Sequence, residues 1–548
     1  MRCFARGGQW RGLVRGRSAG PTCPASVDCV RPLSATMVAQ SCRTVYTWKR
    51  KPALAKIVAT IGPTSEDFDT LQKVVDAGMR VMRINFSHAT FEEADLRITN
   101  LRKSKGKNHT ALGHDFNLRA VLLDTQGPEI RTGNLRSDAP ITVQQGATME
   151  LITDEQYKDD GDEKRLYINY AGLPESVHHG STVLLDDGLI SLNVTDVGSD
   201  SVRVMVENSG TLKSRRGVNL PGARLNLPAL SEKDKVDIRY GVANDVDYVA
   251  ASFVRKPEDL HQIRRFINEE HSKVWPEEHP PPLIVSKIEN MEAVDNFSEI
   301  LAVSDGIMVA RGDLGVEIPA EQVTNMQKMM VRECNKEGKP VIVATQMLES
   351  MQSNPRPTRA EVSDVTNAVY DGADAVMLSG ESAQGRYPVE SVLMMQRIIH
   401  EAEGWSSSFS AQDRQEMFDG RPIAEGCSHS EGLASAAVHA AHSLGAKMIL
   451  VLTKSGTIPR LIAKHRPKVP VICYCPNQKV GRQLILHRSL HPIVGAHDKP
   501  SVDRPAHAIS LARDMGFCQP GDTIILVHKD DQPAFSGETR NLQICKVF

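Results

Sequence analysis

The chain has 548 residues, which is too long for one ordinary domain and suggests roughly three or four. Its 65 basic and 67 acidic residues nearly balance, so charge gives no reason to expect nucleic acid or an anionic membrane as the main partner. No apolar run approaches the roughly 18 residues that a membrane-spanning helix needs, so no membrane partner is expected.

The first fifty residues differ from the rest, because they are rich in arginine and carry Asp28 as their only acid. Such leaders are typical of organelle transit peptides. A disordered extension, or upstream sequence ahead of a true start at Met37, are the alternatives. None of the ten cysteines forms a CxxC pair, which indicates a reduced intracellular protein. We expect a cytoplasmic protein, or a mitochondrial or plastid one if residues 1–50 are a transit peptide.

Short β-branched runs, each followed by a helical stretch, repeat along the chain from Lys56 onward. Nearly continuous apolar runs are typical of strands buried on both faces, and their alternation with helices indicates a parallel sheet. Eight such units predict a (β/α)8 TIM barrel. The predicted strands are Lys56–Ile61, Arg80–Asn85, Ala120–Asp124, Asp247–Ser252, Leu283–Ile288, Gly306–Arg311, Pro340–Thr345 and Ala375–Ser379. Thr358 followed by Glu361 predicts a capping box at the start of the helix before the last of these strands.

Two further domains are predicted around this pattern. About 120 residues of alternating, turn-rich sequence separate the third and fourth strands, which indicates a small β-barrel domain inserted as a lid over the barrel mouth. After roughly Glu403 the chain turns polar, and then an α/β series with an open sheet begins. The predicted domains are 51–127 with 231–403 for the catalytic barrel, 128–230 for the lid, and 404–548 for a C-terminal α/β regulatory domain.

Polar side chains gather at the carboxyl ends of the predicted strands, where barrel active sites form. We expect two carboxylates, a lysine and an arginine to converge there for a functional reason. The set is Thr60, Arg83, Asn85, Ser87, Asp124, Thr125, Ser252, Lys287, Glu289, Arg311, Asp313, Thr345, Ser379 and Glu381.

Glu289 and Asp313 follow neighbouring predicted strands, and two carboxylates with room for water suit Mg²⁺. Lys287 precedes Glu289 by one strand period, so both side chains can point to the same side. There the lysine could stabilise an enolate or a phosphoryl oxygen in transfer. Two alternatives stay open: each carboxylate pairs with a nearby lysine or arginine, or Glu289 merely holds Lys287 in place.

Arg83 lies at a predicted strand end, where its planar guanidinium suits a phosphate group. Oxygens of Asn85, Ser87, Asp124 and Thr125 could bind a monovalent cation, although spacing alone leaves this open. The sequence contains neither GxxxxGK[ST] nor GxGxxG. A bound nucleotide would therefore depend on metal ions and scattered basic residues.

The chain resembles the pyruvate kinase family in a series of motifs that keep the family's order from about Lys56 to the C-terminus. The motifs are KIVATIGPTS (56–65), MRINFSH (82–88), LDTQGPEIRTG (123–133), GVNLPG (217–222), SKIEN (286–290), ARGDLGVE (310–317), ATQMLESM (344–351), PTRAEVSDVTNAVYDGADAVMLSGESAQGRYP (357–388) and TKSG (453–456). The resemblance implies transfer of the phosphoryl group of phosphoenolpyruvate to ADP, giving pyruvate and ATP in glycolysis. It also implies an allosteric homotetramer that needs Mg²⁺ and K⁺.

The resemblance also implies a role for each matching residue. Arg83 would bind the phosphate, Lys287 would be the catalytic lysine, and Thr345 would position the substrate and the water that protonates the enolate. The backbone of Gly312 and Asp313 would bind the substrate carboxylate. The implied Mg²⁺ ligands are Glu289 and Asp313, the implied K⁺ ligands are Asn85, Ser87, Asp124 and Thr125, and the implied nucleotide contacts are Asn85, His88, Arg131 and Arg216. Glu129 matches the glutamate of potassium-dependent members.

Departures from the family pattern concern the nucleotide and a regulatory ligand. Gln126 and Arg216 stand where lysine is usual, which could alter nucleotide contacts. Thr453, Lys454, Ser455, Gly456 and Thr457 resemble the effector-phosphate loop, and amides that open a helix suit phosphate. However, Ile458 replaces a usual hydroxyl, and Asp530 and Asp531 would repel an anion. Activation by a sugar phosphate therefore stays open.

Two rival functions are weighed against this interpretation. Another magnesium–enolate barrel enzyme, a lyase or an aldolase, would not need the inserted lid and the potassium set. An inactive metabolite-sensing scaffold would be expected to lack Lys287, Glu289 or Asp313, and all three are present.

Overall fold

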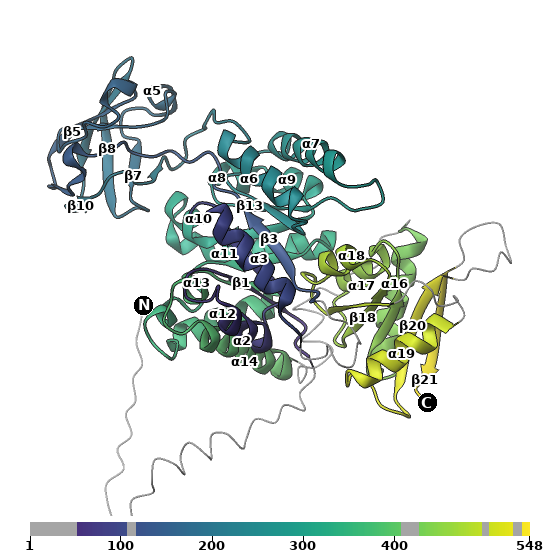
Figure 1. Cartoon of the computed structure of the whole chain (residues 1–548). Coiled ribbons are helices and arrows are strands. Elements are labelled where there is room, and N and C mark those ends of the chain that lie inside the picture. Colours follow the sequence, from purple (N-terminus) through teal and green to yellow (C-terminus); the bar gives the residue numbers. More distant parts are fainter. Residues whose placement is uncertain (1–51, 107–116, 407–426, 496–502, 530–539) are drawn as a thin grey trace, which may run out of the picture. The chain divides into compact units, whose positions relative to one another are not determined.

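The computed structural model describes residues 52–106, 117–406, 427–495, 503–529 and 540–548. The predicted leader with Met37, and the two aspartates Asp530 and Asp531, lie outside the described residues. Eight parallel strands form one closed barrel in the order β1-β16-β15-β14-β13-β12-β3-β2, which confirms the predicted TIM barrel (Figure 1). The barrel strands are β1 (Lys56–Thr60), β2 (Val81–Asn85), β3 (Ala120–Asp124), β12 (Tyr248–Ala251), β13 (Leu283–Ile288), β14 (Gly306–Ala310), β15 (Val341–Ala344) and β16 (Ala375–Leu378).

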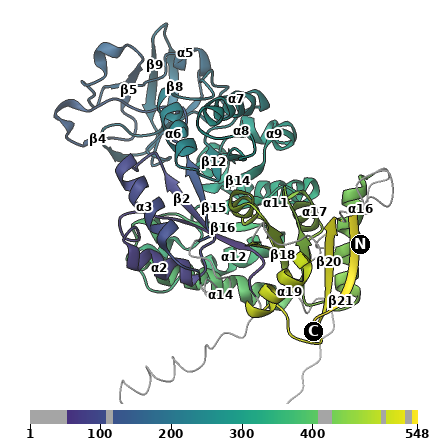
Figure 2. The ribbon, with the colours of Figure 1, turned by 45° about the vertical axis from the view of Figure 1, so that its right-hand side comes forward.

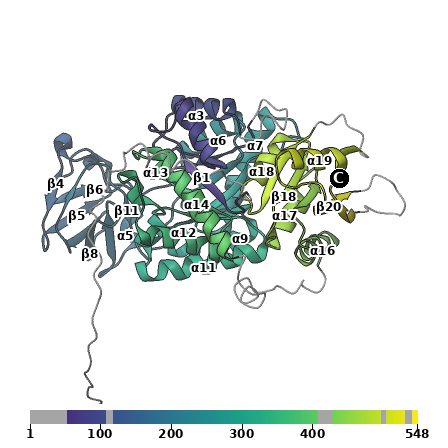
Figure 3. The ribbon, with the colours of Figure 1, turned by 90° about the horizontal axis from the view of Figure 1, so that it is seen from below.

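The barrel strands are buried on both faces because their side chains alternate between two apolar cores. In β1, Val58 packs inside the barrel, whereas Ile57 and Ala59 pack against the surrounding helices. Helices α11, α12 and α14 lie next to one another in this outer layer (Figure 3). The long outer helices are α2 (Phe68–Ala77), α3 (Phe91–Lys103), α6 (Glu232–Ala243), α7 (Pro257–Val274), α11 (Ala320–Glu337), α12 (Arg359–Asp371) and α14 (Pro388–Ser406).

The segment between β3 and α6 folds as a mainly β domain with its own apolar core, and it contains one short α-helix, α5 (Leu173–Ser176). Its six-stranded sheet has the order β11-β7-β8-β9-β5-β6, and β10 pairs with β4. Alternating burial along β9 shows one face packed inward and one face toward solvent. The strands are β4 (Ile141–Val143), β5 (Thr148–Ile152), β6 (Arg165–Tyr167), β7 (Thr182–Leu185), β8 (Ile190–Val197), β9 (Ser201–Val206), β10 (Gly210–Leu212) and β11 (Val218–Asn219).

The C-terminal domain is an open five-stranded sheet of order β19-β18-β17-β20-β21, with helices on both faces. Helix α16 (His429–Ser443) and helix α17 (Thr457–Lys464) pack on one face, and α19 (Arg504–Asp514) packs on the other (Figure 2). The strands are β17 (Ile449–Leu452), β18 (Val471–Cys475), β19 (Leu490–Val494), β20 (Thr523–Lys529) and β21 (Arg540–Lys546).

Ion pairs and apolar contacts join the C-terminal domain to the amino ends of the barrel strands. Helix α18 (Gln478–Leu484) presents Lys479 and Arg482, and both pair with Asp245 and Asp247, which precede β12. Just after this helix, Ile485 and Leu486 join the apolar core inside the barrel. The C-terminal domain therefore closes the end of the barrel opposite to its carboxyl-end mouth.

Two negative findings apply to the described residues. No helix among them is long and apolar enough to span a bilayer. Their cysteines are all free thiols: Cys334, Cys427, Cys473, Cys475, Cys518 and Cys545.

Candidate active site

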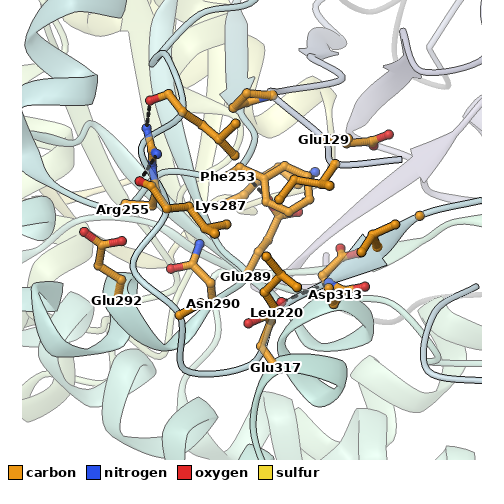
Figure 4. A pocket seen from close by; sticks show the side chains of 18 of the residues that line it. Glu129, Leu220, Phe253, Arg255, Lys287, Glu289, Asn290, Glu292, Asp313 and Glu317 are labelled. Carbon is orange, nitrogen blue, oxygen red and sulfur yellow. Dashed lines mark hydrogen bonds and ion pairs between the residues drawn. The ribbon is translucent and has the colours of Figure 1, made fainter. Parts of the chain in front are cut away.

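A cavity of about 630 Å³ opens at the carboxyl ends of the barrel strands. It is lined by Arg83 of β2. It is also lined by Lys287 and Glu289 at the end of β13 and by Asp313 just after β14 (Figure 4). Lid residues, among them Arg131 and Arg216, also line it. The structure therefore brings Arg83, Lys287, Glu289 and Asp313 together at one cavity.

Lys287 lies between two buried carboxylates. Its Nζ is 2.8 Å from Oε1 of Glu289 and 3.2 Å from Oδ1 of Asp124, and it donates a hydrogen bond of 2.8 Å to Oγ of Ser252. Burial acts to lower the pKa of Lys287, but the charges of Asp124, Glu289 and Asp313 outweigh burial and raise that pKa. The lysine is therefore a fixed positive charge at the cavity wall.

Glu289 is a buried acid with the Lys287 ammonium group beside its Oε1. Its Oε2 accepts a hydrogen bond of 2.6 Å from the backbone N–H of Phe253, while its Oε1 accepts none, although the charge of Lys287 is close. Burial raises the pKa of Glu289, Lys287 opposes this shift, and the negative charge of Asp313 adds to it. A divalent cation between Glu289 and Asp313 would relieve this repulsion.

The chemistry of these donors fits Mg²⁺. Among the described residues, no three His, Cys, Asp or Glu side chains are grouped closely enough to hold a metal ion by themselves. Mg²⁺ keeps several waters and often uses one or two carboxylates together with substrate oxygens. The carboxylates of Glu289 and Asp313, which both line the cavity, match that pattern, whereas Zn²⁺ would require more protein ligands.

Arg83 is held on its strand by side chains rather than left free. Its Nε donates to Oδ2 of Asp124 at 2.6 Å, and its Nη1 donates to Oγ1 of Thr60 at 2.9 Å. Burial acts to raise the pKa of Asp124, but Arg83 and Lys287 hold it below its usual value. Asp124 thus stays ionised and orients both cations.

The four residues expected to bind K⁺ come from the ends of β2 and β3, which pair with each other. Asn85 and Ser87 line the cavity, and Oδ1 of Asn85 accepts a hydrogen bond of 3.1 Å from the N–H of Ser87. Asp124 and Thr125 are buried behind them. These residues supply hard oxygens and a single carboxylate.

Basic residues expected to contact a nucleotide also line the cavity. His88 lies on the barrel side, and Arg131 and Arg216 lie on the lid side. Arg131 donates from Nε to Glu129 at 2.7 Å, and Arg216 lies 3.4 Å from Asp186. Glu129 therefore forms an ion pair with Arg131.

Similarity to known proteins agrees with this geometry. A family model described as pyruvate kinase, barrel domain, matches residues 53–392, and one described as pyruvate kinase, alpha/beta domain, matches residues 431–545. The chain belongs to the pyruvate kinase family.

Individual relatives cover most of the chain. Pyruvate kinase of Bacillus licheniformis is 44% identical over 495 residues, which is 90% of this chain and 80% of that protein. Pyruvate kinase of Hypocrea jecorina is 41% identical over 518 residues, 92% of this chain and 93% of that protein. The crystal structure of a pyruvate kinase from Cryptosporidium parvum superposes with a TM-score of 0.81 at 37% identity, covering 94% of this chain and 98% of that one.

Two of the remaining predicted groups are not among the residues that line the cavity. Thr345 follows β15, and its Oγ1 accepts a hydrogen bond of 2.7 Å from the N–H of Gly312. The possible effector loop, Thr453 to Thr457, joins β17 to α17 in the C-terminal domain, away from the residues that line the cavity. Its turn is closed by a hydrogen bond of 3.0 Å from the N–H of Gly456 to Oγ1 of Thr453.

Several residues that line the cavity were not predicted from the sequence, among them Phe253, Asn219 and Glu317. Phe253 has a positive φ of 54° that turns its N–H toward Glu289, and no sequence signal marks a phenylalanine for that conformation. Asn219 of the lid donates from Nδ2 to Oε1 of Glu317 at 2.9 Å, which links the lid to α10 (Arg311–Glu317). Only the GVNLPG and ARGDLGVE motifs themselves could have pointed to these two side chains.

Proposed function

We propose that the chain is a phosphotransferase that moves the phosphoryl group of phosphoenolpyruvate to ADP, giving pyruvate and ATP. One observation carries this proposal: Lys287, Glu289, Asp313 and Arg83 line one cavity at the mouth of a barrel of this family. The family membership favours this activity over a lyase, an aldolase or an inactive scaffold.

Each side chain of the site has a separate role in the proposed reaction. Arg83 binds the phosphate of phosphoenolpyruvate, and the backbone of Gly312 and Asp313 binds its carboxylate. A β-phosphate oxygen of ADP attacks phosphorus in line, and the bond from phosphorus to the enol oxygen breaks. Lys287 faces the negative charge that develops on that oxygen. Thr345 orients the water that delivers a proton to the enolate carbon.

The metal ions and the lid complete the site. Mg²⁺, held by Glu289 and Asp313, would stabilise negative charge on the phosphoryl and enolate oxygens. Asn85, Ser87, Asp124 and Thr125 would hold K⁺. On the lid side, Arg131 and Arg216, with His88 and Asn85 of the barrel, would contact the nucleotide. Closure of the lid would exclude water, which otherwise hydrolyses the phosphoryl group.

The finer features of the proposal concern the whole protein. We propose a catalytic barrel at 51–127 and 231–403, a lid at 128–230, and a regulatory domain at 404–548 with its effector loop at Thr453 to Thr457. We further propose a homotetramer that acts in glycolysis. Its compartment would be the cytoplasm, or an organelle if residues 1–50 are a transit peptide.

The decisive experiment is ATP formation from phosphoenolpyruvate and ADP by the purified full chain. The rate should depend on Mg²⁺ and should fall when K⁺ is replaced by a non-binding cation. Lys287→Met should lower turnover by roughly a thousandfold or more, because a preorganised charge is lost where negative charge develops. Lys336→Met, at an exposed pair with Glu333, is the matched control and should keep the normal rate. A near-normal rate for a folded Lys287→Met variant would refute the assignment.

A further inference from the structure

Arg311 has a mostly buried, positively charged side chain that has no role in the reaction proposed above. It begins α10, directly after β14 and two residues before Asp313. Its side chain is 11% exposed, and it is absent from the residues that line the cavity. Because Arg311 lies close to the site but does not line the cavity, its buried charge must be balanced by hydrogen-bond partners outside the cavity.

The partner is the backbone at the end of the neighbouring strand β15. Arg311 donates from Nη2 to the carbonyl oxygen of Thr345 at 2.6 Å, and from Nε to that of Ala344 at 3.2 Å. Its Nη1 donates to Oδ1 of Asp364 on α12 at 2.8 Å and to Oε1 of Gln327 on α11 at 3.3 Å. The guanidinium thus clamps two consecutive carbonyls, and two outer helices fix the guanidinium.

The clamped segment has an unfavourable backbone conformation. Thr345 has a φ of 66° and the next residue, Gln346, has a φ of 52°. This left-handed region is a genuine outlier for a β-branched residue, and such a residue costs on the order of 1–3 kcal/mol. Without an external anchor, this segment would relax toward an extended conformation.

The conformation fixes where the Thr345 hydroxyl lies. Its Oγ1 accepts the N–H of Gly312 at 2.7 Å and donates to the carbonyl of Ala344 at 2.6 Å. Gly312 precedes the cavity residue Asp313, so the hydroxyl is tied to the wall of the site. A change of φ at Thr345 would swing this hydroxyl away from Gly312.

We propose that Arg311 is a positioning residue that holds Thr345 in its left-handed conformation and so keeps the hydroxyl in place for protonation of the enolate. This inference rests on the role of Thr345 under the proposed function. Since Arg311 acts only through Thr345, its loss should impair proton delivery and turnover while leaving substrate affinity nearly unchanged.

The test measures two reactions of the full-length protein with Mg²⁺ and K⁺. One is ATP formation from phosphoenolpyruvate and ADP. The other is exchange of the pyruvate methyl hydrogens with deuterated water in the presence of ATP, followed by NMR. Exchange removes and returns a proton at the methyl carbon, so it reports on the proton-transfer half of the reaction.

The variants are Thr345→Val, Arg311→Met and the double variant. Each single variant should slow exchange and kcat by roughly tenfold or more, with the KM for phosphoenolpyruvate within about twofold of the parent value. The double variant should be no slower than Thr345→Val, because two residues that act through one hydroxyl are not additive. Arg311→Lys should not restore exchange, because an ammonium group lacks the planar fork that spans both carbonyls and Asp364.

Arg264 provides the matched control at the other end of the barrel. It also pairs with an aspartate, at 2.9 Å from Asp305, and donates to a carbonyl, that of Val303. Arg264→Met should leave both rates within about twofold of the parent. If Arg311→Met does not fold, as judged by circular dichroism, Asp364→Asn replaces it in the same cycle.

The rates of these variants distinguish a failure of the proposed role of Arg311 from a failure of the proposed phosphotransferase function. Normal rates for Thr345→Val would overturn the role of Thr345 while leaving phosphoryl transfer by the chain intact. A slow Thr345→Val variant together with a normal Arg311→Met variant would overturn the inference alone. Fully additive losses in the double variant, or rescue by Arg311→Lys, would also overturn it.

Discussion

His487 shows how burial between the barrel and the C-terminal domain sets the charge of a single residue. Burial, aided by the nearby charge of Arg460, lowers the pKa of His487 to about 3. An unfolded histidine has a pKa near 6.5, so the unfolded chain binds more protons than the folded chain between about pH 6.5 and about pH 3. The contribution of neutral His487 to the free energy of unfolding is therefore fully present above about pH 6.5 and is lost as the pH falls toward about 3.

Removal of this histidine should therefore make the protein less sensitive to acid. We expect His487→Gln to reduce the loss of unfolding free energy between about pH 7 and about pH 5 by roughly 1–2 kcal/mol. Urea unfolding of the parent and the variant at both pH values measures this difference. The exposed His178, changed to glutamine, is the control. An unchanged pH response of His487→Gln would contradict the assignment.

Much of the candidate site follows from residue spacing. The period of two along β13 places Lys287 and Glu289 on one side, and pairing of β13 with β14 brings Asp313 beside them. The conformations of Phe253 and Thr345 do not follow, because positive φ values at residues other than glycine are imposed by the surrounding fold. The clamp by Arg311 was hidden for the same reason: its partners are backbone carbonyls, which carry no sequence signature.

At the level of elements, the start of α12 tests whether local sequence or tertiary packing stabilises a helix. The capping box predicted from Thr358 and Glu361 is confirmed, with each side chain accepting from the other residue's backbone N–H. Glu361 also accepts from the N–H and hydroxyl of Ser350, so one carboxylate joins the helix to the preceding loop.

Thr358→Ala should remove one half of this box. We expect it to lower the free energy of unfolding by about 1 kcal/mol, since one helical N–H loses its partner. Thermal unfolding monitored by circular dichroism measures the change, with Thr366→Ala in the middle of the same helix as the control. Equal losses of unfolding free energy in the two variants would show that the cap stabilises the helix no more than a threonine in its middle.

Two strands of the C-terminal sheet that the sequence does not predict share one property. β19 and β21 are the two edges of the C-terminal sheet, so each pairs with another strand on one side only. β19 contains Pro492, which is tolerated at an edge because one side of the strand needs no N–H donor. β21 is mostly polar, and none of its residues is buried. The apolar runs used to find strands mark central strands, so the barrel was predictable and these edges were not.

For the whole molecule, Asp374 is a buried contact between the barrel and the C-terminal domain. It precedes β16, and its two oxygens accept from Nη1 and Nη2 of Arg466, both at 2.9 Å. The N–H of Arg488 also donates to it at 2.9 Å. One carboxylate therefore binds two segments of the C-terminal domain.

Asp374→Asn should weaken this attachment strongly. Loss of the charge leaves Arg466 buried without its partner, which costs about 3–5 kcal/mol. Asp371→Asn, at a partly exposed pair with Lys328, should cost less than about 1 kcal/mol. Differential scanning calorimetry compares the two, and equal melting temperatures would mean that Asp374 does not secure the domain.

The place where the lid leaves the barrel has an evolutionary consequence. β3 and β12 pair directly, and Gly127, just before the lid, donates its N–H at 3.0 Å to Oδ1 of Asp234 on α6, just after the lid, so the lid segment starts and finishes at nearly the same point. The barrel's ladder of hydrogen bonds is complete whatever that segment contains. Selection can therefore lengthen, shorten or replace the lid while the scaffold that carries Lys287 and Glu289 is inherited unchanged.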